Sequence, residues 1–299
     1  MEKRKEIFNF VNVFNFILTL VLFVLWGSVG IMHGMIGAIS WVLIKLVFAP
    51  IGVVLFLISL IGLIRSIIKK KNVFQSSISL ILSVALSFPI LMLVNIIPMA
   101  YPINLEDTSP AITIHSPFHE PVLVGWGGDT VETNAPHVIW ASERWAYDLV
   151  IEPENVGSDK LEDYGVYDKE IYAPVSGVVV AAYDKEDDIT PNTEEFISME
   201  GNYVYIKINE TQTFLLLNHL KKNSVDVKVG DNIEVGDYIG KVGNSGTTSE
   251  PHLHIHHQRQ DPTKTVYPIF AEGLPLYFYD ENDNSTMPTS REIMKSTSN

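Results

Sequence analysis

Four of the nine histidines in this sequence lie within six residues, in the segment SEPHLHIHHQ at positions 249–258. Alternate residues of a β-strand point to the same face, so a strand here places His252, His254 and His256 on one face and the apolar residues between them on the other. A neutral imidazole nitrogen can bind a metal ion such as zinc, and it can also exchange a proton near pH 7. The segment therefore predicts a strand with one core face and one chemically active face.

The four histidines are not equally well placed for that chemistry. His256 shares the face of His252 and His254, but at the rise of a strand it lies about 6.6 Å beyond His254. We therefore expect His256 at the edge of a cleft or on the surface, and His257, which faces the other way, in a structural position. A His-x-His pair also occurs on ordinary exposed strands, but the turn GNSGTTSEP (243–251) directly before it suggests a loop at the mouth of a cleft.

Composition divides the 299-residue chain into two unlike parts. Residues 1–100 hold only two of the 35 acidic residues, whereas residues 101–299 hold 33 of them against 13 of the 21 lysines and arginines, a formal charge of −20. This charge argues against binding to nucleic acid, which needs cationic side chains to displace counterions, and it suits a soluble domain. Because the chain has no cysteine, disulfides, thiolate catalysis and cysteine-bound zinc are excluded.

The first hundred residues predict an α-helical membrane region, since a span needs about 20 apolar residues. The three predicted spans are Ile7–Trp26, Trp41–Ile64 and Ser76–Ala100. Basic clusters precede the first span (EKRKE, 2–6) and separate the second from the third (RSIIKKK, 65–71), so both clusters should be cytoplasmic. Three crossings then place residue 101 onward outside the cytoplasm, whereas a separate fourth crossing at Gly30–Ala49 would break this charge pattern.

The rest of the chain predicts an all-β domain followed by a tail. Short β-rich runs bounded by Gly, Pro, Asn and Asp fill residues 101–279 without clear helical periodicity, which indicates an open barrel or sandwich. The polar segment 280–299 is expected to be disordered. The predicted organisation is thus a membrane region at 1–100, a β domain at 101–279 and a disordered tail at 280–299.

Several of these runs together resemble the lysostaphin/LytM-type zinc endopeptidases, which cut peptide bonds in bacterial peptidoglycan. The most specific is VKVGDNIEVGDYIGKVGNSGTTSEPHLHIH (227–256), which is similar to that family's C-terminal signature. Four shorter runs are also similar to elements of the family: YDLVI (147–151), YAPVSGVVV (172–180), GNYVYIKI (201–208) and LLLNHL (215–220). The resemblance covers roughly residues 120–278. It implies a lipoyl-like duplicated hybrid motif, a Zn²⁺ cofactor and a peptidoglycan peptide as substrate.

The resemblance also implies roles for particular residues. His254 and Asp148 correspond to zinc ligands, and His219 and His252 correspond to the two catalytic histidines. Most of the family has another histidine ligand four residues before the aspartate. This sequence has Arg144 there, which keeps its proton and cannot bind zinc.

We assign His137 as the third zinc ligand. It lies eleven residues before Asp148 in NAPHVIWASERWAYD, and a subset of the family is similar, with an Asn-x-His segment before an aromatic-Ala-x-Asp strand. The alternative is a surface-loop histidine beside a lost metal site. His115 and His119, in HSPFHEP, are simpler to interpret as residues of a surface segment.

These assignments predict a hydrolytic site in which two histidines and one aspartate hold zinc with water in the fourth position. Zinc lowers the pKa of such a water to about 7. Either His219 or His252 can accept its proton or stabilise the oxyanion, and the acidic background favours imidazolium in both.

The leading interpretation is therefore a zinc metalloendopeptidase of cell-wall peptidoglycan, held in the cell membrane by several spans with its β domain extracytoplasmic. The alternative is a catalytically inactive peptidase-like domain that binds cell wall or partner proteins, and Arg144 is what motivates it. A lipoyl- or biotinyl-like carrier has a similar glycine-rich β architecture, but no carrier lysine in a hairpin turn is evident.

Overall fold

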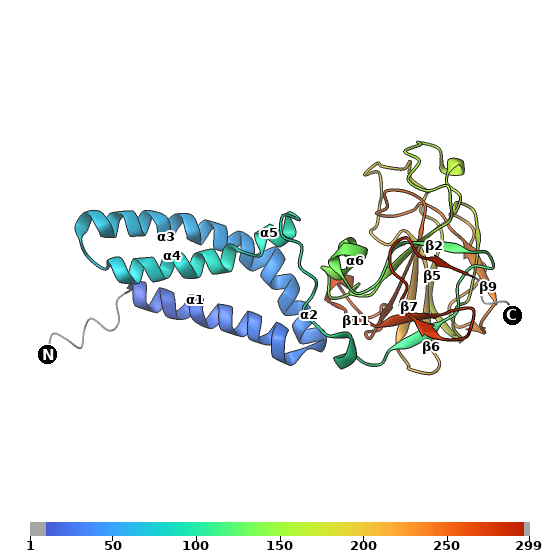
Figure 1. The fold of residues 1–299 in the computed structure, drawn as a ribbon, viewed down its shortest axis with the longest axis horizontal. Coiled ribbons are helices and arrows are strands. Elements are labelled where there is room, and N and C mark those ends of the chain that lie inside the picture. Colours follow the sequence, from blue (N-terminus) through green and yellow to red (C-terminus); the bar gives the residue numbers. More distant parts are fainter. Residues whose placement is uncertain (1–9, 296–299) are drawn as a thin grey trace. The chain divides into compact units, whose positions relative to one another are not determined.

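The computed structural model describes residues 10–295 and divides the chain into two compact units, Met1–Ile103 and Asn104–Asn299 (Figure 1). The division follows Ile103, close to the boundary that the change in composition suggests. The basic cluster at residues 2–6 and the start of the first predicted span lie outside the described residues, as do residues 296–299.

In the described part of the first unit, three helical stretches are long and apolar enough to cross a membrane: Phe10–Met32, Gly34–Lys69 and Val73–Leu93. They correspond to the three predicted spans. The second stretch runs without a break for 36 residues, so the segment after Gly34 is continuous with the second predicted span. The helices are α1 (Phe10–Gly27), α2 (Gly34–Leu43), α3 (Ala49–Lys69), α4 (Val73–Ser87) and α5 (Ile90–Leu93), with π-helical turns at Ser28–Met32 and Ile44–Phe48.

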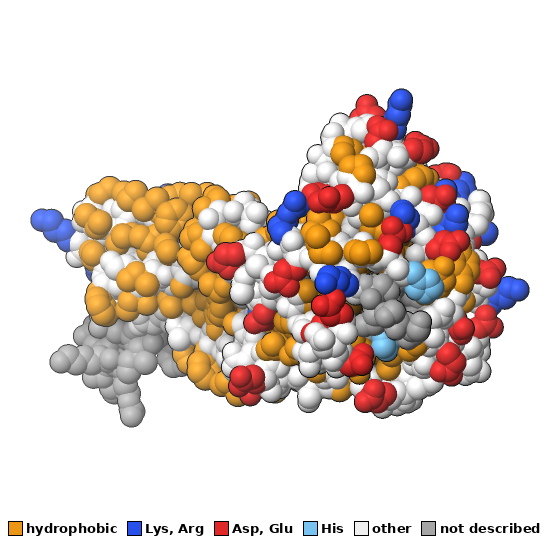
Figure 2. Space-filling model, turned by 45° about the vertical axis from the view of Figure 1, so that its right-hand side comes forward, with side chains coloured by type: hydrophobic (Ala, Val, Ile, Leu, Met, Phe, Trp, Pro, Cys, Tyr) orange, Lys and Arg blue, Asp and Glu red, His pale blue; other side chains and the backbone are white. Residues whose placement is uncertain are grey.

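This first unit exposes apolar side chains and buries polar ones. Figure 2 shows a largely hydrophobic surface over the helices, and Phe10 has an exposed fraction of 83%. Inside the unit, the Ser59 and Ser83 hydroxyls hydrogen-bond at 2.9 Å, and Ser79 donates to Asn15 Oδ1 at 2.6 Å. Polar contacts between helices with apolar outer faces suit a lipid environment, where backbone and side-chain polar groups need internal partners.

The second unit is a β-rich domain, as predicted. Its main sheet has nine strands in the order β14-β2-β3-β10-β7-β6-β5-β8, with β11 paired to β10, and two smaller sheets contain β1-β12-β13 and β4-β9. The strands are β1 (Ile112–Ile114), β2 (Val122–Trp126), β3 (Tyr147–Val150), β4 (Glu170–Tyr172), β5 (Gly177–Tyr183), β6 (Asn202–Ile208), β7 (Phe214–Leu220), β8 (Asn232–Ile233), β9 (Tyr238–Lys241), β10 (Leu253–Gln258), β11 (Gly273–Leu274), β12 (Leu276–Tyr279), β13 (Ser285–Thr286) and β14 (Ile293–Met294).

Strand β10 lies between β3 and β7, and it has the two faces that its sequence predicts. Leu253 and Ile255 are fully buried in the apolar core, with no exposed surface. Alternation then turns His254 and His256 to the opposite face, where they line a cavity. The core thus fixes the strand that carries the candidate site.

Two parts of this unit differ from the sequence-based expectations. A short helix, α6 (Val131–Val138), interrupts the β pattern. Residues 280–295, expected to be disordered, are ordered: β13 pairs with β12, and β14 pairs with β2. The polar composition of this segment reflects a tight turn, in which the Asp280 carboxylate accepts hydrogen bonds from the backbone N–H groups of Asn282 and Asn284.

Candidate metal centre

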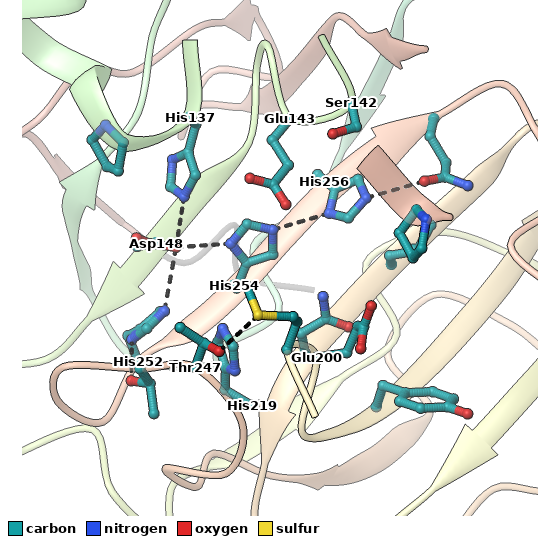
Figure 3. Close-up of a pocket in the computed structure, with 18 of the residues that line it drawn as sticks. His137, Ser142, Glu143, Asp148, Glu200, His219, Thr247, His252, His254 and His256 are labelled. Carbon is teal, nitrogen blue, oxygen red and sulfur yellow. Dashed lines mark hydrogen bonds and ion pairs between the residues drawn. The ribbon is translucent and has the colours of Figure 1, made fainter. Parts of the chain in front are cut away.

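Strand pairing brings Asp148 and His254 together. In the register of β3 and β10, His254 lies directly opposite Asp148, and on the other side of β10 it lies opposite Asn218. Directly opposed residues of an antiparallel pair have neighbouring side chains on one face. The His254 Nδ1 atom therefore lies 3.0 Å from Asp148 Oδ1 (Figure 3).

His137 reaches the same carboxylate from helix α6. The helix is kinked at Asn134, whose φ of −147° is not helical, and Pro136 follows within the helix. Its backbone turns so that the buried His137 Nε2 atom lies 3.4 Å from Asp148 Oδ1. The structure thus brings together the three residues that the sequence assigned to the metal, although their chain positions span more than a hundred residues.

Hydrogen bonds around Asn134 determine which nitrogen of His137 is protonated. The Asn134 amide NH₂ donates to the backbone carbonyls of Gly128 and Ala146, at 2.9 and 3.0 Å. Its Oδ1 must then accept from His137 Nδ1, which lies 2.7 Å away. A neutral His137 therefore presents a bare Nε2 to a carboxylate oxygen, and a proton or a metal cation is needed between these two electron-rich atoms.

His219 enters the cavity through an unusual backbone conformation. Its φ is +63°, a left-handed value that costs a non-glycine residue on the order of 1–3 kcal/mol. This conformation breaks the alternation of β7, so Asn218 and His219 both line the cavity although they are consecutive. The His219 Nδ1 donates to the Ser245 carbonyl at 2.8 Å, which leaves Nε2 of the neutral ring without a proton.

His252 lies just before β10 and is held in the same way. Its Nδ1 is 2.8 Å from the Glu250 carbonyl, an acceptor, so the neutral ring carries its proton on Nδ1 and has a bare Nε2. That Nε2 lies 3.4 Å from Asp148 Oδ1. The ring centres of His252 and His219 are 4.8 Å apart, so the site offers two unprotonated imidazole nitrogens, of which that of His252 lies beside the carboxylate.

Burial outweighs the acidic background in the protonation of these groups. Burial, together with the charges of neighbouring histidines, lowers the pKa of His219 well below its usual value. Burial also lowers the pKa of His252, although Asp148 opposes the shift. The expectation that both rings are imidazolium is therefore corrected, because removal from water penalises the charged form of each.

Asp148 and His137 shift each other's pKa in the opposite sense. For Asp148, burial acts to raise the pKa, but the neighbouring His137 and His252 outweigh it and hold the pKa well below its usual value. For His137, burial acts to lower the pKa, but the charge of Asp148 outweighs it and raises the pKa. The pair thus favours a carboxylate with a cationic partner.

The five candidate site residues line one cavity of about 550 Å³: His137, Asp148, His219, His252 and His254. Glu143 and Glu200 add two further carboxylates to its wall, and within residues 10–295 no lysine or arginine contributes to it. Two overlapping groups in this wall could hold a metal ion: His137, Asp148 and His254, or His219, His252 and His254. The first group contains the carboxylate and matches the assignment made from the sequence.

The other candidate residues lie elsewhere. Arg144, at the position where the sequence departs from the common pattern, is buried and pairs with Asp129 at 3.0 Å. His115 packs against Tyr279 and His119 stacks on Tyr172. These contacts give all three residues packing partners outside the cavity wall.

Of the two positions expected for His256, the surface is wrong and the cleft fits, because His256 lines the cavity; the structural position expected for His257 agrees with its contacts. His256 is not a surface group: it is only 6% exposed, and its Nδ1 lies 3.0 Å from His254 Nε2. His257 is buried on the opposite face and contacts the Pro275 carbonyl and the Thr213 hydroxyl. Rise along a strand places Cα atoms only, and the length of the imidazole ring closes the remaining gap.

Comparison with known families identifies the domain that contains part of this site. Residues 162–266 match the family model described as Peptidase family M23. The chain carries a Peptidase M23 domain. The M23 match includes His219, His252 and His254, whereas His137 and Asp148 precede it. The resemblance to lysostaphin-type peptidases is thereby confirmed, and the first two metal-site residues rest on the strand register and the α6 geometry.

Solved structures give weak likenesses to the same group. A putative M23 peptidase from Pseudomonas aeruginosa is 18% identical, with coverage of 52% of this chain and 57% of that chain and a TM-score of 0.31. Lysostaphin from Staphylococcus simulans is 19% identical, with coverage of 55% and 52% and a TM-score of 0.33. A zinc-containing peptidase from Vibrio cholerae is 17% identical, with coverage of 48% and 37% and a TM-score of 0.31.

This chain thus spans about half the length of the first structures that it matches. No curated protein matches it. The family assignment therefore rests on the M23 domain itself.

Proposed function

We propose that this protein is a zinc-dependent endopeptidase that hydrolyses peptide bonds in bacterial cell-wall peptidoglycan. The observation that carries the proposal is the convergence of three imidazole rings on the Asp148 carboxylate, two of which, His252 and His254, belong to the M23 match. In this proposal the metal ligands are His137, Asp148 and His254, and the catalytic residues are His219 and His252.

The donor set fits zinc. Two imidazole nitrogens and one carboxylate oxygen are a common ligand set for catalytic zinc, with a fourth position left open. Among these atoms, the Nε2 of a neutral His137 faces Asp148 Oδ1 without a proton, an arrangement that a cation stabilises. A zinc ion held there supplies Lewis-acid chemistry, in that it polarises the scissile carbonyl and acidifies water.

The two remaining histidines supply the proton transfers. With Nδ1 donated to a backbone carbonyl, each ring offers Nε2 as the only site for a new proton. One Nε2 accepts a proton from the attacking water, hydrogen-bonds the developing oxyanion while it holds that proton, and then returns the proton to the leaving amine. The other Nε2 stays unprotonated and accepts a hydrogen bond that orients the water. The lowered pKa values keep both rings unprotonated at the start of the cycle.

The membrane region gives the proposal a location. The three apolar stretches are suited to anchor the chain in a membrane. With the basic clusters at residues 2–6 and 65–71 in the cytoplasm, an odd number of crossings leaves the β domain on the outer side, where peptidoglycan lies. The proposed location is therefore the cell membrane, multi-pass, with an extracytoplasmic domain.

The test uses the full chain purified in detergent. We expect one zinc per chain by elemental analysis, release of soluble peptides with new amino termini from purified peptidoglycan, and loss of this release after chelation, with recovery on adding zinc. His137→Ala should lose zinc and activity together. Full zinc occupancy in His137→Ala would overturn the third-ligand assignment. A wild-type chain that cleaves no peptidoglycan with or without added zinc would favour the alternative, a peptidase-like domain that binds wall or partner proteins.

A further inference from the structure

His256 is connected to the metal-site residue His254 by a hydrogen-bonded relay. His254 Nε2 lies 3.0 Å from His256 Nδ1 (Figure 3). His256 Nε2 in turn lies 3.3 Å from Gln258 Oε1. The Gln258 amide then donates through Nε2 to the backbone carbonyl of Gln260 at 2.6 Å. The three relay residues, His254, His256 and Gln258, are buried on one face of β10.

The far end of this relay determines its direction. A backbone carbonyl can only accept, so Gln258 must donate to Gln260 with its NH₂ and accept with its Oε1. His256 Nε2 therefore carries the proton that it donates to Gln258. In a ring with one proton, Nδ1 is then bare, and it accepts the Nε2 proton of His254.

This direction leaves His254 Nδ1 without a proton, 3.0 Å from Asp148 Oδ1. In the opposite direction, His254 would carry its proton on Nδ1, donate it to the Asp148 carboxylate and so block two ligand atoms of the proposed metal site at once. The difference between a metal-binding and a metal-excluding His254 is thus the position of one proton.

We propose that His256 and Gln258 are positioning residues that hold His254 in its metal-binding tautomer. The inference rests on the proposed function, because it assigns the relay a role toward the zinc ion. A buried partner for the second nitrogen of a ligand histidine both orients the ring and fixes its tautomer. Here the partner is a second histidine, whose own tautomer is set by an amide.

The relay is anchored beyond the strand. The side-chain Oε1 of Gln260 accepts a hydrogen bond from the backbone N–H of Glu272 at 2.7 Å, and Gln258 pairs with Gly273 in the ladder of β10 and β11. The acceptor that sets the direction is therefore held by the fold and does not depend on the metal.

The test compares three single variants of the full chain with wild type. His256→Leu removes the acceptor, and zinc affinity measured by chelator competition should fall about 10- to 100-fold. His256→Asn puts an oxygen near the place of Nδ1 and should restore most of that affinity. His257→Asn is the control: His257 is equally buried in the same strand but faces away from His254, and the variant should bind zinc as wild type does.

A spectroscopic readout separates tautomer from general damage. With metal removed, the ¹⁵N shifts of His254 should report the Nε2–H form in wild type and a mixture in His256→Leu. Gln258→Leu, which leaves both histidines in place, should also shift His254 toward the mixture and weaken zinc binding, and it keeps the test usable if His256→Leu does not fold. Unchanged zinc affinity and an unchanged His254 tautomer in Gln258→Leu would overturn the relay. If wild type itself binds no zinc, the proposed function fails instead.

Discussion

Both units of this chain bury polar side chains, but the pairs between helices match a donor with an acceptor, whereas in the β unit several possible acceptors converge on one carboxylate. In the helical unit, Ser79 donates to Asn15 Oδ1 while the Asn15 amide donates to the Gln75 carbonyl, so each donor meets an acceptor. In the β unit, the Nε2 of a neutral His137 faces the Asp148 carboxylate, so two acceptors meet unless a proton or a metal cation lies between them.

The difference shows how buried polar groups can be interpreted without a bound ligand. Matched donors and acceptors satisfy one another, and their contribution is to structure. Acceptors that converge on one point are unfavourable in a dry interior unless a cation joins them, because desolvated lone pairs repel. The helical pairs therefore indicate an assembly of helices, and the β-unit cluster indicates a metal site.

The largest expected effect comes from removing the shared carboxylate. Asp148→Asn should reduce zinc content from one per chain to near zero and lower peptidoglycan cleavage more than about 1000-fold, because the metal supplies several kcal/mol of transition-state stabilisation. Glu143→Gln, which neutralises another cavity-wall carboxylate, should keep its zinc. Loss of zinc from both variants would mean that general negative charge, and not the particular ligand, holds the ion.

Removing one catalytic imidazole should separate binding from turnover. His219→Ala should keep zinc and lose about 10²- to 10⁴-fold in turnover, since its Nε2 transfers protons and holds no metal. Zinc analysis alongside peptide release checks this. Because His219 also belongs to the second group that could hold a metal, zinc loss in this variant would move the proposed ligand set to His219, His252 and His254.

Much of the fold and part of the site could be predicted from local sequence pattern. Three apolar runs were enough to predict the helices, and alternation in HLHIH was enough to predict a strand with Leu253 in the core and His254 in the site. These features depend on the period of side-chain direction, which a sequence carries directly.

The remaining features depend on contacts between distant segments. The contact of His256 with His254 depends on ring length and strand geometry, and the φ of +63° at His219 follows from a bulge between β6 and β7. The segment after residue 280 was expected to be disordered because it is polar, yet Ile293 and Met294 pair with β2 at the edge of the main sheet. Such pairing depends on which edge is free, and composition carries no information about it.

Acid should weaken the β unit through a buried histidine outside the metal site. Burial lowers the pKa of His257 to about 4, from a usual value of 6.5. The folded state thus favours the neutral ring, so this contribution is fully present above pH 6.5 and is lost as the pH falls toward 4, for a total of about 3 kcal/mol. Denaturant unfolding of wild type and His257→Asn at several pH values between 7 and 4 gives the free energy of unfolding of each. The contribution of His257 is the additional decrease in this free energy that wild type shows as the pH falls. Parallel pH profiles would show that His257 does not titrate between the two states.

The smallest expected effect is in the helical unit. The hydrogen bond between Ser59 and Ser83 should contribute to the stability of this unit and not to zinc binding or peptide cleavage. Ser83→Ala leaves the Ser59 hydroxyl without its 2.9 Å partner, and a hydrogen bond between membrane helices contributes only about 0.6 kcal/mol on average. The variant should unfold slightly more easily in denaturing detergent and keep its zinc and cleavage rate. Ser77→Ala on the same helix is the control, since its exposed hydroxyl bonds only to the Val73 carbonyl one turn earlier. A loss of zinc or turnover in Ser83→Ala would contradict the comparison, because it would give the matched polar groups a part in the site's chemistry.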